Sequence, residues 1–414
     1  MSGARLLTFG CRLNLHESER MQALTAHLDD VVVVNTCAVT TSAERQARQA
    51  IRKSHRENPD KRIVVTGCAA QIAPENWRGL PGVAQVMGNT EKLKAASWTR
   101  DALRRESVIA DIMDTAPVPA SSVVETGGHV RALLQVQQGC DHRCTFCIIP
   151  YGRGRSRSVP VSEVIERARG LVEAGHHEIV LTGVDIASWG RDLDGTPALG
   201  TLCRAVLQAV PELPRLRLSS LDPASVDHDL WHLLAEEPRF LPHLHLSLQA
   251  ASDLVLKRMK RRHSVRDAAD LIRRARSLRP DIAIGADLIA GFPTETDEQA
   301  QETLDFVTAH RLPYLHVFPY SERPGTPAAR MPSVPNARRQ ARAAALRAVG
   351  ETNRQAYWLG MIGQPLDVLM EGAERGHSAH FIPVRLKGGQ AQRGQRLTLK
   401  ARTLDEAGLV AEIN

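Results

Sequence analysis

Short apolar runs that end near a cysteine recur at the start of the chain. Residues 6–9, 31–34 and 63–65 are strand-like, and one or two small or polar residues separate them from Cys11, Cys37 and Cys68. Helix-like stretches follow the first two cysteines, and the spacing is about that of one βαβ unit. The pattern predicts three parallel strands with a cysteine at each C-terminal end. Because such ends meet at one ligand-binding crevice, we expect the three thiols to converge.

The middle of the chain alternates strand-like and helix-like segments. A stretch rich in Pro, Ser and Gly, residues 111–129, predicts a linker before it. Amphipathic segments such as 161–174 and 265–278 separate six strand-like runs, which are residues 131–137, 178–181, 215–219, 243–248, 283–289 and 315–320. This alternation predicts an α/β sheet, open or curled toward a partial barrel, with its chemistry at the C-terminal strand ends.

The last part of the chain changes character. A predicted helix, residues 336–358, leads into four short strand-like runs, which are residues 365–370, 380–386, 395–401 and 408–413. They predict a β-barrel of about 60 residues, which either contacts nucleic acid or is a structural cap. We therefore expect three units, with boundaries at residues 1–115, 126–352 and 353–414.

Composition narrows the class of protein. The chain has 414 residues, 43% of them hydrophobic and 24% charged, which is typical of packed soluble domains. No apolar run reaches the ~18 residues of a membrane span, and the N-terminus does not resemble a secretory signal, so we expect a cytoplasmic protein without membrane partners. The net charge is +7, and all but eight of the 53 basic residues are Arg. Arginine suits a polyanionic partner, although an Arg-rich codon bias would give the same composition.

A second group of cysteines carries the strongest chemical signal. Cys140, Cys144 and Cys147 form a C-x-x-x-C-x-x-C motif after the first strand of the central unit. Three thiolates on one loop can hold three irons of a 4Fe–4S cluster and leave the fourth iron open to an external molecule. A zinc site is the alternative, but no second cysteine arm follows, and His142 is poorly placed to complete one. Cys203 has a helical context and is expected to be a buried small hydrophobe.

Around this loop the chain resembles the radical S-adenosylmethionine (SAM) superfamily, and in particular its methylthiotransferase branch. The matching segments are collinear and cover nearly the whole chain. They are residues 8–14, 35–37, 67–68, 139–157, 181–185, 217–220, 243–249, 287–295, 318–321 and 325–326. The resemblance implies an N-terminal three-layer βα domain, a central partial (β/α)6 radical SAM barrel and a small C-terminal TRAM-like barrel that grips RNA.

The resemblance also implies the cofactors and partners. SAM would bind the cluster on the central cysteines and yield a 5′-deoxyadenosyl radical, and another SAM would provide a methyl group. A second 4Fe–4S cluster, which supplies or carries sulfur, would be held by Cys11, Cys37 and Cys68. The expected partners are tRNA, a flavodoxin- or ferredoxin-like electron donor and a sulfur donor.

The stretch from Thr8 to Glu19 most resembles the subfamily that modifies N6-threonylcarbamoyladenosine next to the anticodon, at position 37. Isopentenyladenosine and a ribosomal-protein aspartate are the alternative substrates within the branch. A non-enzymatic iron–sulfur RNA-binding protein is a further alternative, but its cluster would normally have a fourth protein ligand. The chain departs from the family pattern at Ala250-Ala251, where Ser-Gly is usual, at Asp185, where Asn is common, and at Asp222, where Glu is common.

Further site residues are expected at strand ends and beside the cluster loop. The candidates for SAM contact are Phe146, Gly183, Asp185, Ser219, Gln249 and Gly291. Turn geometry is the alternative explanation for both glycines, and Asp287 either binds or caps the next helix. The Gly–Arg alternation after Cys147 suits phosphate contact, so the RNA-binding candidates are Arg153, Arg155 and Arg157. A second basic run, residues 257–262, is interpreted as a solvated face.

Overall fold

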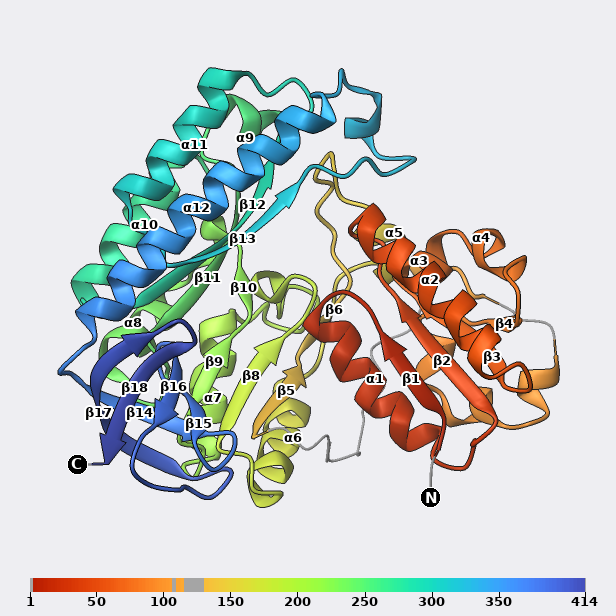
Figure 1. The fold of residues 1–414 in the computed structure, drawn as a ribbon, viewed down its shortest axis with the longest axis horizontal. Coiled ribbons are helices and arrows are strands. Elements are labelled where there is room, and N and C mark those ends of the chain that lie inside the picture. The colour runs from red at the N-terminus through yellow and green to blue at the C-terminus, as the bar shows by residue number, and fades with distance from the viewer. Residues whose placement is uncertain (1–2, 106–108, 115–129, 414) are drawn as a thin grey trace.

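A four-stranded parallel sheet, in the order β1-β2-β3-β4, forms the N-terminal unit of the computed structural model, which describes residues 3–105, 109–114 and 130–413 (Figure 1). The strands are β1 (Arg5–Thr8), β2 (Val31–Thr36), β3 (Arg62–Gly67) and β4 (Val83–Val86). The helices are α1 (Arg12–Leu24), α2 (Thr41–Glu57), α3 (Cys68–Ile72) and α4 (Glu75–Arg78). Most of the expected linker, residues 115–129, lies outside the described residues.

The alternation of side chains along β2 explains why this unit has three layers. Val32 and Val34 pack with α2, α3 and α4 on one face of the sheet. Val31 and Val33 pack on the other face, with α1 and with the 3-10 turns Ala95–Trp98 and Ala102–Arg104. The three expected strands and the layered architecture are confirmed, whereas β4 was not expected.

The central unit has six parallel strand positions in two adjoining sheets, β5-β8-β9 and β10-β11-β12-β13. They are β5 (Arg131–Gln135), β8 (Glu178–Thr182), β9 (Leu216–Leu218) continued by β10 (Ser220–Leu221), β11 (His243–Gln249), β12 (Ala283–Ala290) and β13 (Tyr314–Pro319). The helices are α5 (Ile149–Arg153), α6 (Val161–Glu173), α7 (Leu199–Ala209), α8 (His228–Glu236), α9 (Asp253–Met259), α10 (Val265–Leu278) and α11 (Asp297–Ala309). A separate antiparallel pair consists of β6 (Gln137–Gln138) and β7 (Arg157–Ser158). All six expected strands are present, and they form the expected partial barrel, which is called the half barrel below.

Each central strand presents apolar side chains to the helices and other side chains to the interior. On β11, for example, Leu244, Leu246 and Leu248 belong to the large hydrophobic core between the strands and the helices. The period of two then places His243 and His245 on the inner face. The interior of the half barrel is therefore polar and charged, while its outer face supplies the apolar packing.

The C-terminal segment forms a closed barrel. The helix α12 (Asn336–Gly360) precedes it, and its strands lie in the order β14-β15-β16-β18-β17. They are β14 (Pro365–Met370), β15 (Arg375–Ser378), β16 (Pro383–Leu386), β17 (Arg396–Asp405) and β18 (Gly408–Ile413). The four expected strands are present, and β15 is an additional one.

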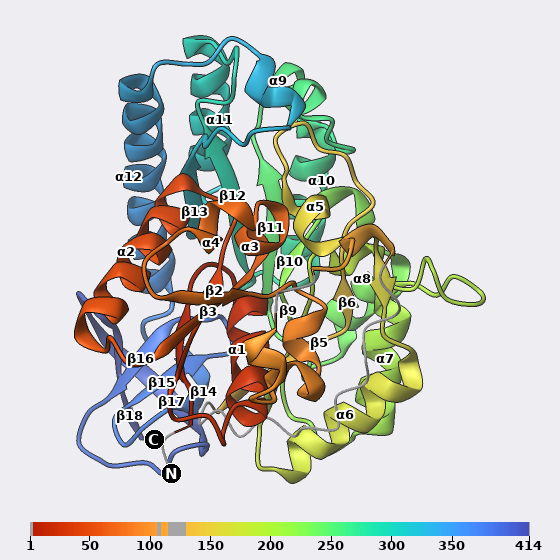
Figure 2. The same cartoon turned by 90° about the vertical axis from the view of Figure 1, so that its right-hand side faces the viewer.

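The N-terminal unit lies beside the half barrel, and the C-terminal barrel lies at the end where the central strands begin (Figures 1 and 2). Helix α1 contacts β5, and α5 contacts α3. In the described part of the chain, no helix combines the length and apolar character required to cross a bilayer.

Candidate functional site

The C-x-x-x-C-x-x-C motif occupies the loop between β6 and α5, which is called the cluster loop below. The Cys147 amide donates a hydrogen bond of 3.0 Å to the Cys144 carbonyl, and the three cysteines are partly buried. Burial raises the pKa of Cys140 to about 12, and the nearby negative charges of Asp185, Cys147 and Cys144 act in the same direction. Burial, together with the Cys144 thiolate, raises the pKa of Cys147 to about 11. The three thiols therefore lie close together, and Cys140 and Cys147 keep their protons at neutral pH until a metal displaces them.

A second loop, after β8, is fixed against the cluster loop. The Val184 and Asp185 amides donate to Gln137 Oε1 at 3.0 and 2.8 Å. Gly183 is required by this close approach, because a Cβ there would lie 2.7 Å from the Gln137 carbonyl oxygen. Asp185 Oδ2 lies 3.8 Å from Cys140 Sγ and 3.0 Å from His142 Nε2. Burial alone would raise the pKa of Asp185, but hydrogen bonds from His142 and Ser188 outweigh it and lower that pKa.

Two other expected residues hold the loop and a neighbouring turn. The Phe146 ring meets Phe292 edge-on, with ring centroids 6.4 Å apart, in a small apolar cluster. The Gly291 amide donates to Glu295 Oε2 at 2.8 Å, and its φ of +72° is one that favours glycine. Phe146 therefore connects the cluster loop to the segment after β12, and Gly291 has the turn geometry given as its alternative explanation.

The last two candidates for SAM contact lie at neighbouring strand ends. Ser219 interrupts the strand formed by β9 and β10, and its amide donates to the Leu181 carbonyl at 3.0 Å. Gln249 ends β11 with a φ of +69°, a conformation that non-glycine residues seldom adopt outside functional or strained sites. These residues line the same end of the half barrel as the cluster loop, where chemistry is expected in this fold.

Arg261 also approaches the cluster loop, although its basic run was interpreted as a solvated face. Its guanidinium lies 3.7 Å from Cys144 Sγ and donates to the Ser247 carbonyl at 2.7 Å. Its side chain is only 8% exposed and pairs with Asp222 at 3.2 Å. The interpretation was wrong for this residue, and the partners that bury it are distant in sequence.

The three N-terminal cysteines converge as expected. Cys11 follows β1 directly through Gly10, Cys37 follows β2, and Cys68 follows β3; these strands are adjacent and parallel. A Cβ on Gly10 would lie 2.6 Å from Cys37 Sγ, so the first loop touches the second. Burial raises the pKa of Cys37 to about 12, and the charges of Cys68 and Cys11 act in the same direction. The three sulfurs form a second group at one sheet edge.

Comparisons with known proteins decide the family. Residues 134–307 match the radical SAM superfamily, and residues 4–88 match the uncharacterized protein family UPF0004. A threonylcarbamoyladenosine tRNA methylthiotransferase of Rickettsia prowazekii is 46% identical over 383 residues, which cover 92% of this chain and 90% of that protein. The chain belongs to the radical SAM methylthiotransferases. Membership brings SAM and a 4Fe–4S cluster as cofactors.

Other relatives of this methylthiotransferase carry names with either of two tRNA nucleosides. A protein of Bacillus subtilis with the same printed name as the Rickettsia enzyme is 37% identical, with 78% of this chain and 74% of that protein covered. A tRNA-2-methylthio-N6-dimethylallyladenosine synthase of Paracoccus denitrificans is 36% identical, with 88% and 85% covered. The solved radical SAM methyltransferase TsrM of Kitasatospora setae has a TM-score of 0.58 and 15% identity, with 80% and 77% covered, and so shows a shared fold alone.

In this methylthiotransferase, Arg153 is not available for RNA, contrary to expectation. Its side chain is 2% exposed and lies beside the N-terminal cysteines. Its Nε donates to Cys68 Sγ at 3.0 Å, and its Nη2 donates to Asn14 Oδ1 at 2.5 Å and to Glu17 Oε2 at 3.0 Å. Burial at the interface between two units removes it from solvent, so the RNA-binding prediction for Arg153 was wrong.

The two neighbouring arginines of the loop differ from Arg153. Arg155 is exposed, and Arg157 is half-buried with its Nη2 donating to the Arg153 carbonyl at 2.8 Å. Burial and the positive charge of Arg153 lower the pKa of Arg157. RNA contact by these two residues stays a prediction.

A third group of polar residues lies inside the half barrel. Asp287 Oδ1 is 3.0 Å from His245 Nε2 and 3.1 Å from His316 Nδ1. Burial would raise the pKa of Asp287, but hydrogen bonds from the two histidines outweigh it and lower that pKa. Asp287 lies within β12 rather than at its end, so it does not cap a helix. Cys203 is fully buried in the core on α7, as expected.

Proposed function

We propose that this methylthiotransferase converts N6-threonylcarbamoyladenosine at position 37 of tRNA to its 2-methylthio derivative. The proposal rests on relatives with that printed substrate, at 46%, 37% and 32% identity over 92%, 78% and 99% of this chain. Within the chain, one observation carries it: two separate groups of three cysteines lie on either side of α5. One group suits a SAM-binding cluster, and the other suits a cluster that handles sulfur.

The cysteines fit both iron–sulfur clusters. Each group has three sulfurs and, among the described residues, no fourth cysteine nearby, which leaves one iron of each cluster without a protein ligand. We propose Cys140, Cys144 and Cys147 as ligands of the SAM-binding cluster. We propose the auxiliary cluster at the other three, Cys11, Cys37 and Cys68. Arg153 supports the second assignment, because its buried cation beside Cys68 offsets thiolate charge.

The cofactors supply the radical and the methyl group when bound, and the chain orients the reactants and excludes water. We propose that Asp185, Gly183, Ser219, Gln249, Gly291 and Phe146 shape the SAM pocket beside the cluster loop. Asp185 is the strongest of these candidates, because its carboxylate is held by His142 and Ser188 and remains ionised. An ionised carboxylate there can accept hydrogen bonds from hydroxyl or ammonium groups of SAM.

The partners of this reaction complete the proposal. The tRNA would contact Arg155, Arg157 and the C-terminal barrel, and flavodoxin- or ferredoxin-like proteins would supply electrons. A sulfur donor would renew the auxiliary cluster, and the cytoplasm is the compartment that holds all of these partners. We propose domain limits at 1–115, 126–352 and 353–414; the first two meet at residues outside the described ranges.

The direct test uses the anaerobically reconstituted protein with an anticodon stem–loop that carries N6-threonylcarbamoyladenosine. Mass spectrometry of the digested RNA should show the mass increase of one methylthio group, and Cys144→Ala should abolish both this product and SAM cleavage. Cys68→Ala should retain SAM cleavage but form no methylthio product. Cys203→Ala is the matched control and should keep both activities. SAM cleavage without product from the intact protein, or product only from an isopentenyladenosine stem–loop, would contradict the proposed substrate.

A further inference from the structure

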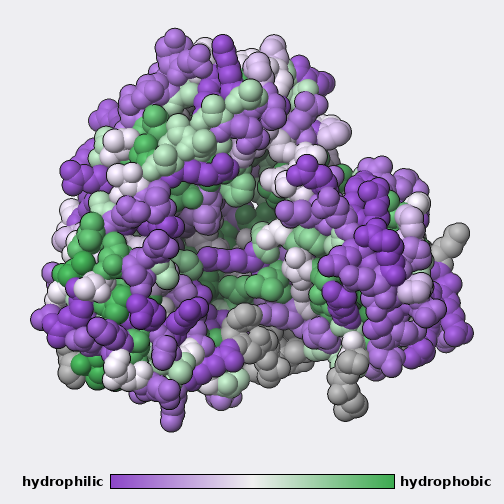
Figure 3. All heavy atoms as spheres, in the orientation of Figure 1, coloured by the Kyte–Doolittle hydropathy of each residue, from purple (hydrophilic) through white to green (hydrophobic). Residues whose placement is uncertain are grey.

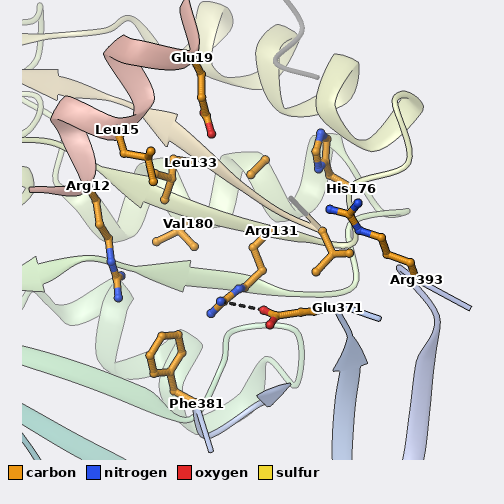
Figure 4. Close-up of a pocket in the computed structure, with 12 residues that line it drawn as sticks. Arg12, Leu15, Glu19, Arg131, Leu133, His176, Val180, Glu371, Phe381 and Arg393 are labelled. Carbon is orange, nitrogen blue, oxygen red and sulfur yellow. Dashed lines mark ion pairs between the residues drawn. The ribbon is translucent and has the colours of Figure 1, made fainter. Parts of the chain in front are cut away.

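A cavity of about 330 Å³ opens between α1, the first two strands of the half barrel and the C-terminal barrel. Figure 3 shows a hollow between the two lobes of the molecule, and the residues that line the cavity come from three units of the fold (Figure 4). Leu15, Leu133 and Val180 form an apolar wall, and the guanidinium groups of Arg12 and Arg131 lie beside it on the side of Phe381. The cavity therefore suits a ligand with an aliphatic part and a charged end.

The charged end of the cavity has an excess of cations. Arg131 pairs with Glu371 at 2.8 Å, and Arg217, just behind it, donates to Glu178 at 2.7 Å. Arg12 has no carboxylate partner among the residues that the structure describes; its guanidinium lies 5.5 Å from the centre of the Phe381 ring. The guanidinium groups of Arg131 and Arg217 lie 5.0 and 5.2 Å from the same ring. Three guanidinium groups thus surround one aromatic ring.

Two further observations indicate that this end of the cavity suits an anion. The Arg217 side chain is only 1% exposed, and its Nη1 has no hydrogen-bond partner among the described residues. Burial and Arg217 lower the pKa of His243 beside the ring well below its ordinary value. Unpaired buried donors and an excess of positive charge are costly unless a ligand satisfies them.

Phe381 bounds the cavity on one side, and the strands on its wall, β5 and β8, run toward the cluster loop. Phe381 packs against His243 and Tyr314, at the start of β11 and β13, and so forms a floor. Val180, on the cavity wall, lies two residues before the end of β8, a rise of about 7 Å. The loop that follows β8 carries Gly183 and Asp185 beside Cys140. The distance from that loop to the cavity is on the scale of a purine with an extended substituent.

We propose that this cavity binds the carboxylate-bearing side chain of the substrate nucleoside, with Arg12 as its specificity-determining contact. This inference rests on the proposed function, because it assigns parts of the proposed substrate to the walls of the cavity. The threonyl carboxylate would pair with Arg12, and its aliphatic carbons would contact Leu15 and Val180. An RNA phosphate carries the same kind of charge, but its chain continues on both sides, which does not suit a cavity bounded on one side by Phe381.

The test compares two stem–loop RNAs that differ only in this group. One carries N6-threonylcarbamoyladenosine, and the other carries its methylamide, which is neutral but nearly the same size. Intact enzyme, Arg12→Gln and Arg12→Lys are assayed with both RNAs, and Arg266→Gln, on the exposed face of α10, is the matched control. Iron content and SAM cleavage are measured for each variant, because Arg12 adjoins Cys11 in sequence. The ratio of kcat/KM for acid over amide cancels any loss of active enzyme.

We expect the intact enzyme and Arg266→Gln to prefer the acid by about 10- to 100-fold, the value of one charge-assisted hydrogen bond. Arg12→Gln should reduce this preference to within about threefold, and Arg12→Lys should retain part of it. Equal losses on both RNAs in Arg12→Gln would indicate a phosphate contact or a structural role and would overturn the inference. An intact enzyme that accepts both RNAs equally would also overturn it. Failure of the intact enzyme on the acid RNA would instead contradict the proposed function.

Discussion

Three buried charged side chains at the interface between the first two units give a quantitative prediction. Glu17 and Lys92 are 0% exposed and Arg153 is 2% exposed. Lys92 Nζ lies 2.6 Å from Glu17 Oε2, and Arg153 contacts both oxygens of the same carboxylate. One carboxylate therefore serves two buried cations. Removing Glu17 should lower the free energy of unfolding by more than removing either cation does, because both cations are then left without their carboxylate.

The magnitude follows from the pKa of Glu17. Burial alone would raise that pKa, but the charges of Arg153 and Lys92 outweigh it and lower the pKa from 4.5 to about 2. At 1.36 kcal/mol per pKa unit, this difference is equivalent to about 3 kcal/mol. Breaking a buried pair typically costs about 3–5 kcal/mol. Glu17→Gln should therefore lower the free energy of unfolding by about 3–4 kcal/mol at pH 7.

Arg153→Met is the matched variant. It leaves Glu17 paired with Lys92, one carboxylate with one cation, and the expected loss is about 1–3 kcal/mol, that of hydrogen bonds to a charged group. Urea unfolding of the reduced, metal-free proteins measures both values. Tryptophan fluorescence follows the unfolding through five tryptophans, and one of them, Trp98, lies at this site, where its Nε1 donates to the Lys92 carbonyl at 2.8 Å. Circular dichroism must give the same midpoint for the two-state treatment to hold.

The direction of this pKa shift determines how the contribution of Glu17 to stability changes with pH. Because folding lowers the pKa of Glu17, its contribution is fully present above about pH 4.5 and is lost as the pH falls toward 2. The difference between the intact protein and Glu17→Gln should be constant from pH 7 to 5 and about 2 kcal/mol smaller at pH 3. A Glu17→Gln variant within 0.5 kcal/mol of the intact protein, or less destabilised than Arg153→Met, would refute the electrostatic reasoning.

Three other predictions rest on separate contacts. Glu178 accepts a hydrogen bond from Arg217 and forms an ion pair with Arg215, and the two lower its pKa to about 2, so Glu178→Gln should be destabilising above pH 4.5 and converge with the intact protein in acid unfolding below it. Arg153→Met should lower iron retention by the N-terminal cysteines, measured in a Cys144→Ala background. An unchanged iron content there would mean that Arg153 does not offset thiolate charge. Cys203→Ala should keep the iron and lose about 1 kcal/mol of stability in urea unfolding; iron loss would reveal a role as a ligand.

The sequence predicted the elements whose signal is local. The strands before Cys11, Cys37 and Cys68 are apolar runs closed by small residues, and their order in the sheet follows the chain. By contrast, β15 has the sequence Arg-Gly-His-Ser, with no apolar side chain. Its Gly376 and Ser378 are buried because they are small, not because they are hydrophobic, so hydropathy does not find this strand.

The charged residues of the interior were the hardest to predict. Arg153 stands in a Gly–Arg alternation, which is typical of a phosphate contact, but its partners Cys68 and Glu17 are 85 and 136 residues away. Arg261 likewise belongs to a basic run, and its partners Cys144 and Asp222 come from other strand ends. The burial of an arginine depends on which distant carboxylates and thiols meet it, and a single sequence does not contain that information.

Helix α5 explains how the chain keeps its two cysteine groups at a fixed separation. It begins two residues after Cys147, and the ideal Cβ position on Gly152 lies 3.2 Å from the Cys68 Cβ. Asn89 Nδ2 donates to the Gly152 carbonyl at 2.6 Å, which locks this helix onto the N-terminal sheet. Arg153 is the sixth residue after Cys147, and the helix from Ile149 to Arg153 rises by about 6 Å. Because one short rigid segment bridges both groups, their distance is set by local backbone geometry.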